Sequence, residues 1–187
     1  NLNSISQIVF LGAGLDTRAY RFTPLKTNVH KVFEIDFPYV ISHKERIMKN
    51  KVPLCDVIRI PTDLTESDWS YHLLRSSFHN DIPTFWILEG LVYYLEKSEV
   101  KSLITDAARM SSEGSQIFMD IIQPSKFFRS LSSYNDNKKI IDLFFESTGW
   151  EVSLKLVNDY NLYQDVINDW NFFIHGKRIK MNKLAKK

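Results

Sequence analysis

The stretch Ile8–Asp16, IVFLGAGLD, decides the fold of this chain. Its apolar residues Ile8–Leu11 run directly into Gly12-Ala13-Gly14, and a continuous apolar run bounded by glycines predicts a strand buried on both faces of a parallel sheet. Glycines let the backbone turn sharply and leave room for a ligand against the main chain. The stretch therefore predicts a nucleotide-type pocket at the carboxyl end of this strand, with Asp16 capping a short helix over residues 17–22.

Two phosphate-binding motifs do not match this loop. A dinucleotide-binding loop has the pattern G-x-G-x-x-G or G-x-G-x-x-A, and Thr17 occupies its third small position here. The P-loop pattern G-x-x-x-x-G-K-[ST] occurs nowhere in the chain. Because a lone G-x-G also occurs in tight turns without a ligand, the nature of the pocket depends on the residues at the other strand ends.

Acidic residues follow each of the next three predicted strands. The strand 31–37 carries Asp36, which lies 22 positions after Gly14, where nucleotide folds place the acid that binds ribose hydroxyls. A helix-starting proline follows two positions later, so Asp36 could instead cap that helix. Asp63 follows the strand 56–60 and could accept a hydrogen bond from an exocyclic amine such as that of adenine, or could be a turn residue.

The strand 84–88 is apolar throughout and runs into Glu89. Acids thus follow the carboxyl ends of successive predicted strands, at Asp16, Asp36, Asp63 and Glu89. Acidic residues scattered over a surface would not coincide with strand ends in this regular way. Such an acidic rim suits an uncharged or cationic ligand with hydroxyls and amines better than a pyrophosphate. The pattern favours a nucleoside that carries a positive centre over NAD or ATP.

The second half of the chain completes the predicted sheet. Further strands are predicted over 115–122, 150–157 and 170–179. Helices are predicted over 38–50, 67–78 and 138–149. The stretch 91–112 is predicted to form two helices, the second of which starts at Ser98. The last two strands lack a full crossover helix between them, which predicts an antiparallel pair. We therefore expect one α/β domain over residues 1–187, a Rossmann-like three-layer sandwich whose seven-stranded, mostly parallel sheet has an antiparallel C-terminal strand. The aromatic-rich segment 124–137 is predicted to cover the substrate.

Composition argues against several classes of function. The 187 residues carry 24 basic and 22 acidic side chains. The resulting net charge of +2 does not indicate a protein that binds nucleic acid. Cys55 is the single cysteine, and His72 and His79 lack metal-ligand spacing, so neither a disulfide framework nor a metal site is expected. With no apolar run of membrane length and no recognisable signal peptide, we expect a cytoplasmic protein without a membrane partner. The sequence predicts no particular oligomeric state.

Four segments in this order carry a resemblance to a known family. They are LGAGLDTRAYRF at residues 11–22, FEIDFP at 33–38, TDL at 62–64 and LEGLVYYL at 88–95. Together they resemble the leucine carboxyl methyltransferase family of S-adenosylmethionine (SAM)-dependent enzymes, from about Ile8 to Gly149. That family includes the enzyme that methylates the C-terminal leucine carboxylate of a protein phosphatase, and many bacterial relatives thought to act on small molecules or polyketides.

The resemblance implies SAM as the cofactor and a set of binding residues at the strand ends, which are Gly12, Gly14, Asp36, Asp63, Leu64 and Glu89. The glycines would line the binding loop, Asp36 would bind the ribose, and Asp63 with Leu64 would hold the adenine edge. Glu89 would face the methionine end, and Tyr94 would lie beside the substrate as the candidate catalytic residue. The family's N-terminal helices, whose lysine and arginine hold the methionine carboxylate, have no counterpart in these 187 residues.

These features predict a SAM-dependent O-methyltransferase acting on a carboxylate or hydroxyl of a small molecule or a peptide C-terminus. Because no histidine or lysine stands at a strand end, a carboxylate acceptor, which is already ionised, is favoured over a hydroxyl that would need a base. The alternative is a catalytically impaired remnant of the fold that acts as a binding module. An NAD-dependent enzyme is a weaker alternative, since Thr17 and the acidic rim oppose it.

Overall fold

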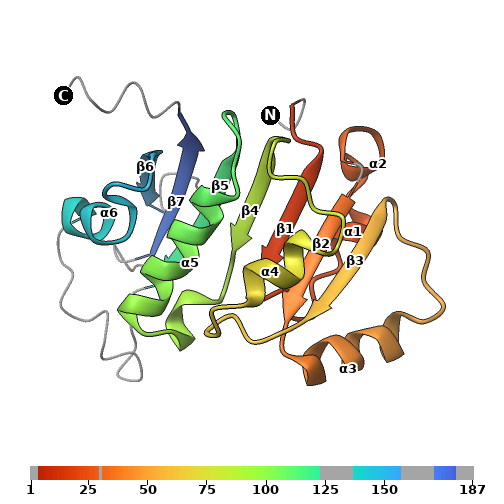
Figure 1. Cartoon of the computed structure of the whole chain (residues 1–187). Helices are drawn as coiled ribbons and strands as arrows, with labels where there is room; N and C mark the ends of the chain where they lie inside the picture. The colour runs from red at the N-terminus through yellow and green to blue at the C-terminus, as the bar shows by residue number, and fades with distance from the viewer. Residues whose placement is uncertain (1–3, 30, 123–136, 157–170, 180–187) are drawn as a thin grey trace.

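A computed structural model of the chain describes residues 4–29, 31–122, 137–156 and 171–179. These residues form a seven-stranded sheet in the order β3-β2-β1-β4-β5-β7-β6. The strands are β1 (Gln7–Leu11), β2 (Lys31–Asp36), β3 (Asp56–Pro61), β4 (Thr84–Leu88), β5 (Gln116–Ile122), β6 (Trp150–Leu156) and β7 (Asn171–Arg178). Neighbours among β1–β5 pair in parallel, whereas β7 pairs antiparallel with both β5 and β6, which confirms the predicted sheet (Figure 1).

Helices cover both faces of the sheet and give the predicted three layers. One face is covered by α4 (Trp69–Leu74), α5 (Lys97–Arg109) and α6 (Asn137–Phe145), and α4 and α5 lie in front of the sheet in Figure 1. The other face carries α1 (Arg18–Arg21), α2 (Leu25–Asn28) and α3 (Pro38–Met48). A short 3₁₀ turn, η1 (Val92–Tyr94), follows β4. The helix α2 was not expected from the sequence.

The central strand β1 sends its side chains alternately into two hydrophobic cores. Val9 and Leu11 pack with Trp69 and other residues of the α4 and α5 face, whereas Ile8 and Phe10 pack with residues such as Ala19 on the α1 face. All five residues of β1 are buried. This double burial explains why the strand reads as a continuous apolar run rather than as an alternating one.

A buried ion cluster ties α3 to the sheet. Glu34, in the middle of β2, is only 1% exposed, and its carboxylate lies 2.9 Å from the Lys44 Nζ of α3 and 3.0 Å from the Arg59 Nε of β3. Lys44 is also 1% exposed, and Arg59 Nη2 donates to the hydroxyl of Tyr20 at 2.5 Å. A carboxylate excluded from water is tolerated here because two cations neutralise it.

Several predicted helix ends were wrong. The helix predicted over 67–78 spans only Trp69–Leu74, with Asp68 as its N-cap residue. The residues after Glu89 form the 3₁₀ turn, and α5 starts one residue before Ser98. A reciprocal capping box decides that start, because Glu96 N–H donates to the Glu99 carboxylate at 2.6 Å while the Glu96 side chain caps the backbone at Glu99.

The helix predicted over 138–149 ends at Phe145 instead of at Gly149. Ser147 adopts the left-handed conformation with φ 62°, and the Thr148 hydroxyl donates to the Phe145 carbonyl at 2.6 Å. These two residues end the helix before the glycine is reached. The segment 124–137, predicted to cover the substrate, lies outside the described residues except for its last position.

The order of the strands positions a crevice beside β1. Chain connections run from β1 outward to β2 and β3, and then return to β4 on the other side of β1. The carboxyl ends of β1, β2 and β4 meet at the lower edge of the sheet in Figure 1. In open α/β sheets, a reversal of strand order of this kind leaves a crevice where ligands bind.

Candidate functional site

Two adjoining hollows lie at this edge of the sheet. The first has a volume of about 390 Å³ and is lined by most of the residues singled out in the sequence, namely Gly12, Gly14, Asp36, Asp63, Leu64 and Tyr94. The second has a volume of about 460 Å³ and contains Glu89 in its lining. Gly12, Gly14 and Gly90 line both hollows, so the glycine loop after β1 and the turn after β4 form the boundary between them.

The glycine loop folds back over the end of β2. The N–H groups of Gly12 and Ala13 both donate to the Ile35 carbonyl at 3.0 Å. Gly12 has φ 70°, and a Cβ there would lie 2.9 Å from the Leu91 Cδ1 atom, so this position requires glycine. Gly14 also has a positive φ, and its N–H donates to Asp36 Oδ2 at 2.7 Å.

Asp36 connects the glycine loop to the start of α3. Its Oδ2 accepts from Gly14, and its Oδ1 accepts from the N–H of Phe37 at 2.7 Å. The alternative role as a cap of α3 is not observed, since Phe37 is the N-cap residue and no side chain caps that end. Each carboxylate oxygen can accept more than one hydrogen bond, so ribose binding by Asp36 stays a prediction that this arrangement permits.

Asp63 and Leu64 form the wall of the first hollow beyond β3. Asp63 Oδ1 accepts from both the N–H and the hydroxyl of Thr65, at 2.9 and 2.8 Å, so the turn role considered from the sequence is present. Asp63 Oδ2 makes no hydrogen bond to any described residue and can still accept from a ligand amine. Leu64 is 8% exposed and offers an apolar surface in the same wall.

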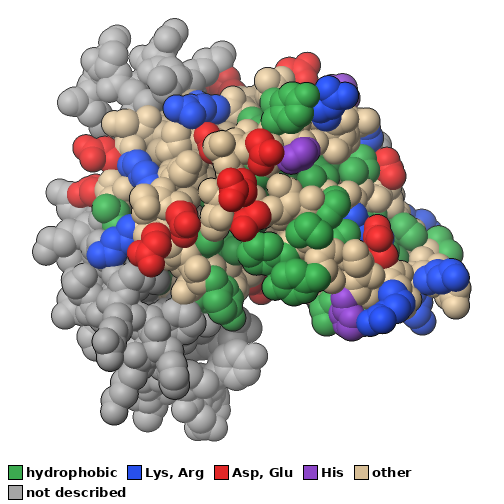
Figure 2. Space-filling view, turned by 60° about the horizontal axis from the view of Figure 1, so that its bottom comes forward, with side chains coloured by type: hydrophobic (Ala, Val, Ile, Leu, Met, Phe, Trp, Pro, Cys, Tyr) green, Lys and Arg blue, Asp and Glu red, His purple; other side chains and the backbone are tan. Residues whose placement is uncertain are grey.

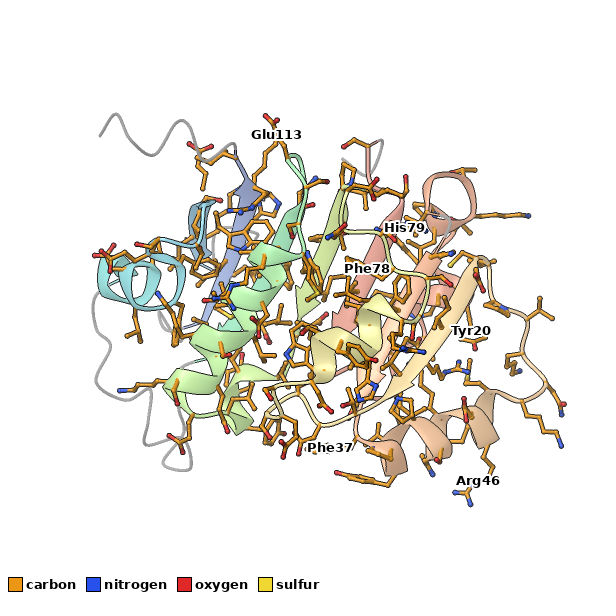
Figure 3. All side chains as sticks on the ribbon, in the orientation of Figure 1. Tyr20, Phe37, Arg46, Phe78, His79 and Glu113 are labelled. Atoms are coloured by element: carbon orange, nitrogen blue, oxygen red, sulfur yellow. The ribbon has the colours of Figure 1, made fainter. Side chains whose placement is uncertain are left out.

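Aromatic side chains surround the mouth of the first hollow. Phe37 and Tyr39 stack with ring centroids 5.6 Å apart, and Tyr94 is 77% exposed. Figure 2, in which the lower edge turns toward the viewer, shows hydrophobic side chains gathered near acidic ones, and Figure 3 shows Phe37 at that edge, beside the start of α3. Exposed aromatic rings beside a cavity are suited to contact with a flat or apolar ligand group.

Arg18 joins the glycine loop to the end of β4 in the second hollow, a contact that sequence reasoning missed. Its Nε donates to Asp16 Oδ2 at 2.6 Å and its Nη2 to Glu89 Oε2 at 2.7 Å. The prediction that Asp16 caps this helix was wrong, since Thr17 is the N-cap residue of α1, but Asp16 Oδ1 does accept from the Arg18 N–H at 2.6 Å. Burial lowers the pKa of Arg18, but the hydrogen bonds and charges of Asp16 and Glu89 outweigh it and raise the pKa above its ordinary value.

Asp120 is the second residue of this hollow that sequence reasoning missed. It lies near the end of β5, is 7% exposed, and accepts a hydrogen bond from the Gly90 N–H at 2.8 Å. Burial raises the pKa of Asp120, and the nearby charge of Glu89 adds to this, while hydrogen bonds from Gly90 and the Tyr93 side chain oppose it. The signal was present in the sequence, since Asp120 is the only acid in the apolar stretch SQIFMDII.

The raised pKa of Asp120 predicts a pH dependence of stability. In the folded state this carboxyl keeps its proton to higher pH than in the unfolded chain, so its contribution is lost as pH rises above about 4. We expect wild-type protein to lose unfolding free energy between pH 4 and pH 7 relative to Asp120→Asn, which has no proton to release. Urea denaturation of both proteins at the two pH values measures this difference, and parallel pH profiles would contradict it.

Two further observations concern metal ligands and membrane-spanning helices among the described residues. No group of three or more histidine, cysteine, aspartate or glutamate side chains is arranged to hold a metal ion in the part of the chain that the structure describes. Among those same residues, no helix has the length and apolar character needed to cross a lipid bilayer.

Solved structures define the class to which this fold belongs. A protein of the duf574 family from Streptomyces avermitilis superposes with a TM-score of 0.68 at 14% sequence identity, covering 94% of this chain and 76% of that one. Human N-acetylserotonin methyltransferase, solved in complex with SAM, superposes with a TM-score of 0.61 at 12% identity, covering 96% of this chain and 49% of that one. The chain therefore has the Rossmann-like α/β fold found in methyltransferases.

Sequence comparison narrows the class to a family. The family model for leucine carboxyl methyltransferase matches residues 2–108, more than half of the chain. The chain belongs to the leucine carboxyl methyltransferase family, which confirms the resemblance seen in the sequence.

Curated relatives share this core but are longer. Proteins that carry the provisional name of S-adenosyl-L-methionine-dependent methyltransferase match from Parafrankia sp. (strain EAN1pec), at 36% identity over 119 residues, and from Streptomyces coelicolor, at 36% over 135 residues. These matches cover 62% and 71% of this chain but only 37% and 42% of the relatives. The chain thus spans less than half the length of these curated relatives.

Proposed function

We propose that this chain binds SAM and supplies the cofactor-binding core of an O-methyltransferase, in one domain over residues 1–187. The observation that carries the proposal is the pair of hollows that share the glycine loop. One hollow joins Asp36, Asp63 and apolar surface, and the other contains several carboxylates. A nucleoside with a cationic amino-acid end fits these two hollows, because the nucleoside suits the partly apolar one and the cationic end suits the one that contains the carboxylates.

The residues present fit such a cofactor. We assign the adenosine part to the first hollow, where Asp36 would accept from ribose hydroxyls and Asp63 with Leu64 would contact adenine. Asp63 Oδ2, which makes no hydrogen bond to a described residue, and the apolar surface of Leu64 support this assignment. We assign the methionine end to the second hollow, where Glu89 would face its positive charge. Gly12 and Gly14 would let the backbone approach the cofactor closely.

The cofactor, when bound, supplies an activated methyl group and a sulfide leaving group, so the protein's task is positioning and electrostatics. We infer that the acceptor is a carboxylate or hydroxyl of a small molecule or of a peptide C-terminus, and that Tyr94, at the mouth of the first hollow, contacts it. No described histidine or lysine lines either hollow. A carboxylate acceptor fits this best, because it is ionised at neutral pH and needs no general base.

A second candidate function is a binding module that holds the cofactor without turnover. It is favoured by the length of the curated relatives, of which the chain spans 37% and 42%. Both candidate functions include cofactor binding, but only the enzyme transfers a methyl group. For either, a reducing compartment such as the cytoplasm is proposed, since Cys55 is the single cysteine of the sequence.

Calorimetric titration of the purified chain with SAM, S-adenosylhomocysteine and NAD tests the proposal. We expect binding of the first two in the micromolar range and none of NAD, because the acidic rim repels a pyrophosphate. A folded chain that binds neither SAM nor S-adenosylhomocysteine would overturn the proposal. Incubation with SAM carrying a labelled methyl group and a panel of carboxylic acids and alcohols then separates the enzyme, which transfers label, from the module, which does not.

A further inference from the structure

In the turn after β4, Gly90 is held by a hydrogen bond to the neighbouring strand rather than by packing. Gly90 has φ 67°, and a Cβ placed on it would meet no described atom within 4 Å. Its N–H donates to Asp120 Oδ1 at 2.8 Å, across 30 positions of sequence. A left-handed glycine with open space around it has many accessible conformations, so this hydrogen bond selects the one observed.

The same carboxyl holds the far end of the turn. The Tyr93 side chain also hydrogen-bonds to Asp120. The segment between these two bonds contains Leu91, which lines the first hollow and lies against Gly12, and Val92, which is 3% exposed. Glu89, which precedes the segment, is paired with Arg18. One buried side chain thus supports the β4 side of the boundary between the two hollows.

We propose that Asp120 is a positioning residue of the cofactor site, which acts by holding Gly90 and Tyr93 and thereby placing Glu89 against the methionine end of the cofactor. This inference rests on the proposed function. The carboxyl acts as a hydrogen-bond acceptor, and its negative charge is not what the role needs. Asparagine at this position keeps one acceptor oxygen for the Gly90 N–H, whereas alanine keeps none.

The experiment compares wild-type chain, Asp120→Ala and Asp120→Asn, with calorimetric affinities for S-adenosylhomocysteine and for adenosine, which lacks the amino-acid end. We expect Asp120→Ala to weaken the binding of S-adenosylhomocysteine about tenfold, because the Gly90 N–H loses its acceptor and Glu89 loses its position, and to weaken the binding of adenosine less than about twofold. Asp120→Asn is expected to remain within about threefold of wild type for both ligands. Asp106→Ala, which removes an aspartate paired with Arg109 on α5, is the matched control and should change neither affinity.

Three results would overturn the inference. They are an unchanged affinity in Asp120→Ala, an equal loss for both ligands, and an Asp120→Asn variant as weak as the alanine variant, which would show that the charge itself acts on the ligand. Should Asp120→Ala not fold, as thermal unfolding would reveal, Tyr93→Phe removes one of the two donors and is expected to lose about threefold in S-adenosylhomocysteine affinity with adenosine unchanged. Wild-type protein that binds neither ligand would instead refute the proposed function, so the two failures are distinguishable.

Discussion

Replacing Glu34 by Gln is expected to lower the free energy of unfolding by about 3–5 kcal/mol, because it leaves a buried cation without its counter-charge. Lys44 is 1% exposed, and its ammonium lies 2.9 Å from the Glu34 carboxylate. Arg59, the other partner, is 15% exposed and also donates to Tyr20, so it depends less on Glu34. Urea denaturation monitored by circular dichroism measures the change.

Two control variants separate charge from packing. Lys44→Met leaves Glu34 paired with Arg59, so we expect a smaller loss than for Glu34→Gln. The double variant Glu34→Leu with Lys44→Met replaces the buried ion pair by apolar side chains of similar size, which in other proteins has little net cost. A loss below about 1 kcal/mol for Glu34→Gln would show that Lys44 reaches water or another partner in the variant.

Replacing Asp36 by Ala is expected to weaken binding of S-adenosylhomocysteine by about 1–3 kcal/mol, or roughly 5- to 150-fold. The variant loses the acceptor proposed for the ribose hydroxyls and also frees the N–H groups of Gly14 and Phe37, which the carboxylate now holds at 2.7 Å. Asp56→Ala is the matched control, because Asp56 is an exposed aspartate at the opposite end of β3. Calorimetry on both variants measures the effect.

An Asp36→Ala variant that folds as wild type and keeps its affinity would remove Asp36 from the cofactor site. The affinity for methylthioadenosine, which keeps the ribose but lacks the amino-acid end, adds a second comparison. Because ribose contacts are common to both ligands, Asp36→Ala should weaken both by a similar factor. That result contrasts with the selective loss expected for Asp120→Ala.

Local patterns sufficed to predict the strands and the rim of the site. The apolar run Ile8–Leu11 with its glycines predicted a central buried strand, and the acids Asp36, Asp63 and Glu89 were correctly placed at the edge where the strands end. Strand periodicity and turn residues act over a few positions, so a single sequence contains them in full. Family membership followed from the same short segments.

Helix ends were less predictable, although they are local. At α5 the choice between Ser98 and the observed start depended on the reciprocal bonds of Glu96 and Glu99, and at α6 on the left-handed Ser147. Several residues near each end have side chains capable of capping, and only the geometry of the folded chain selects one of them.

The sequence by itself determined the class of the sheet, the glycine loop and the acids along its edge, because these depend on neighbours within a few residues. Only the tertiary structure decided which charges meet. Arg18 reaches Glu89 across 71 positions, Asp120 reaches Gly90 across 30, and Glu34 is neutralised by residues of α3 and β3. Such pairings depend on the order of strands in the sheet and on burial, and neither is encoded in the spacing of any one segment.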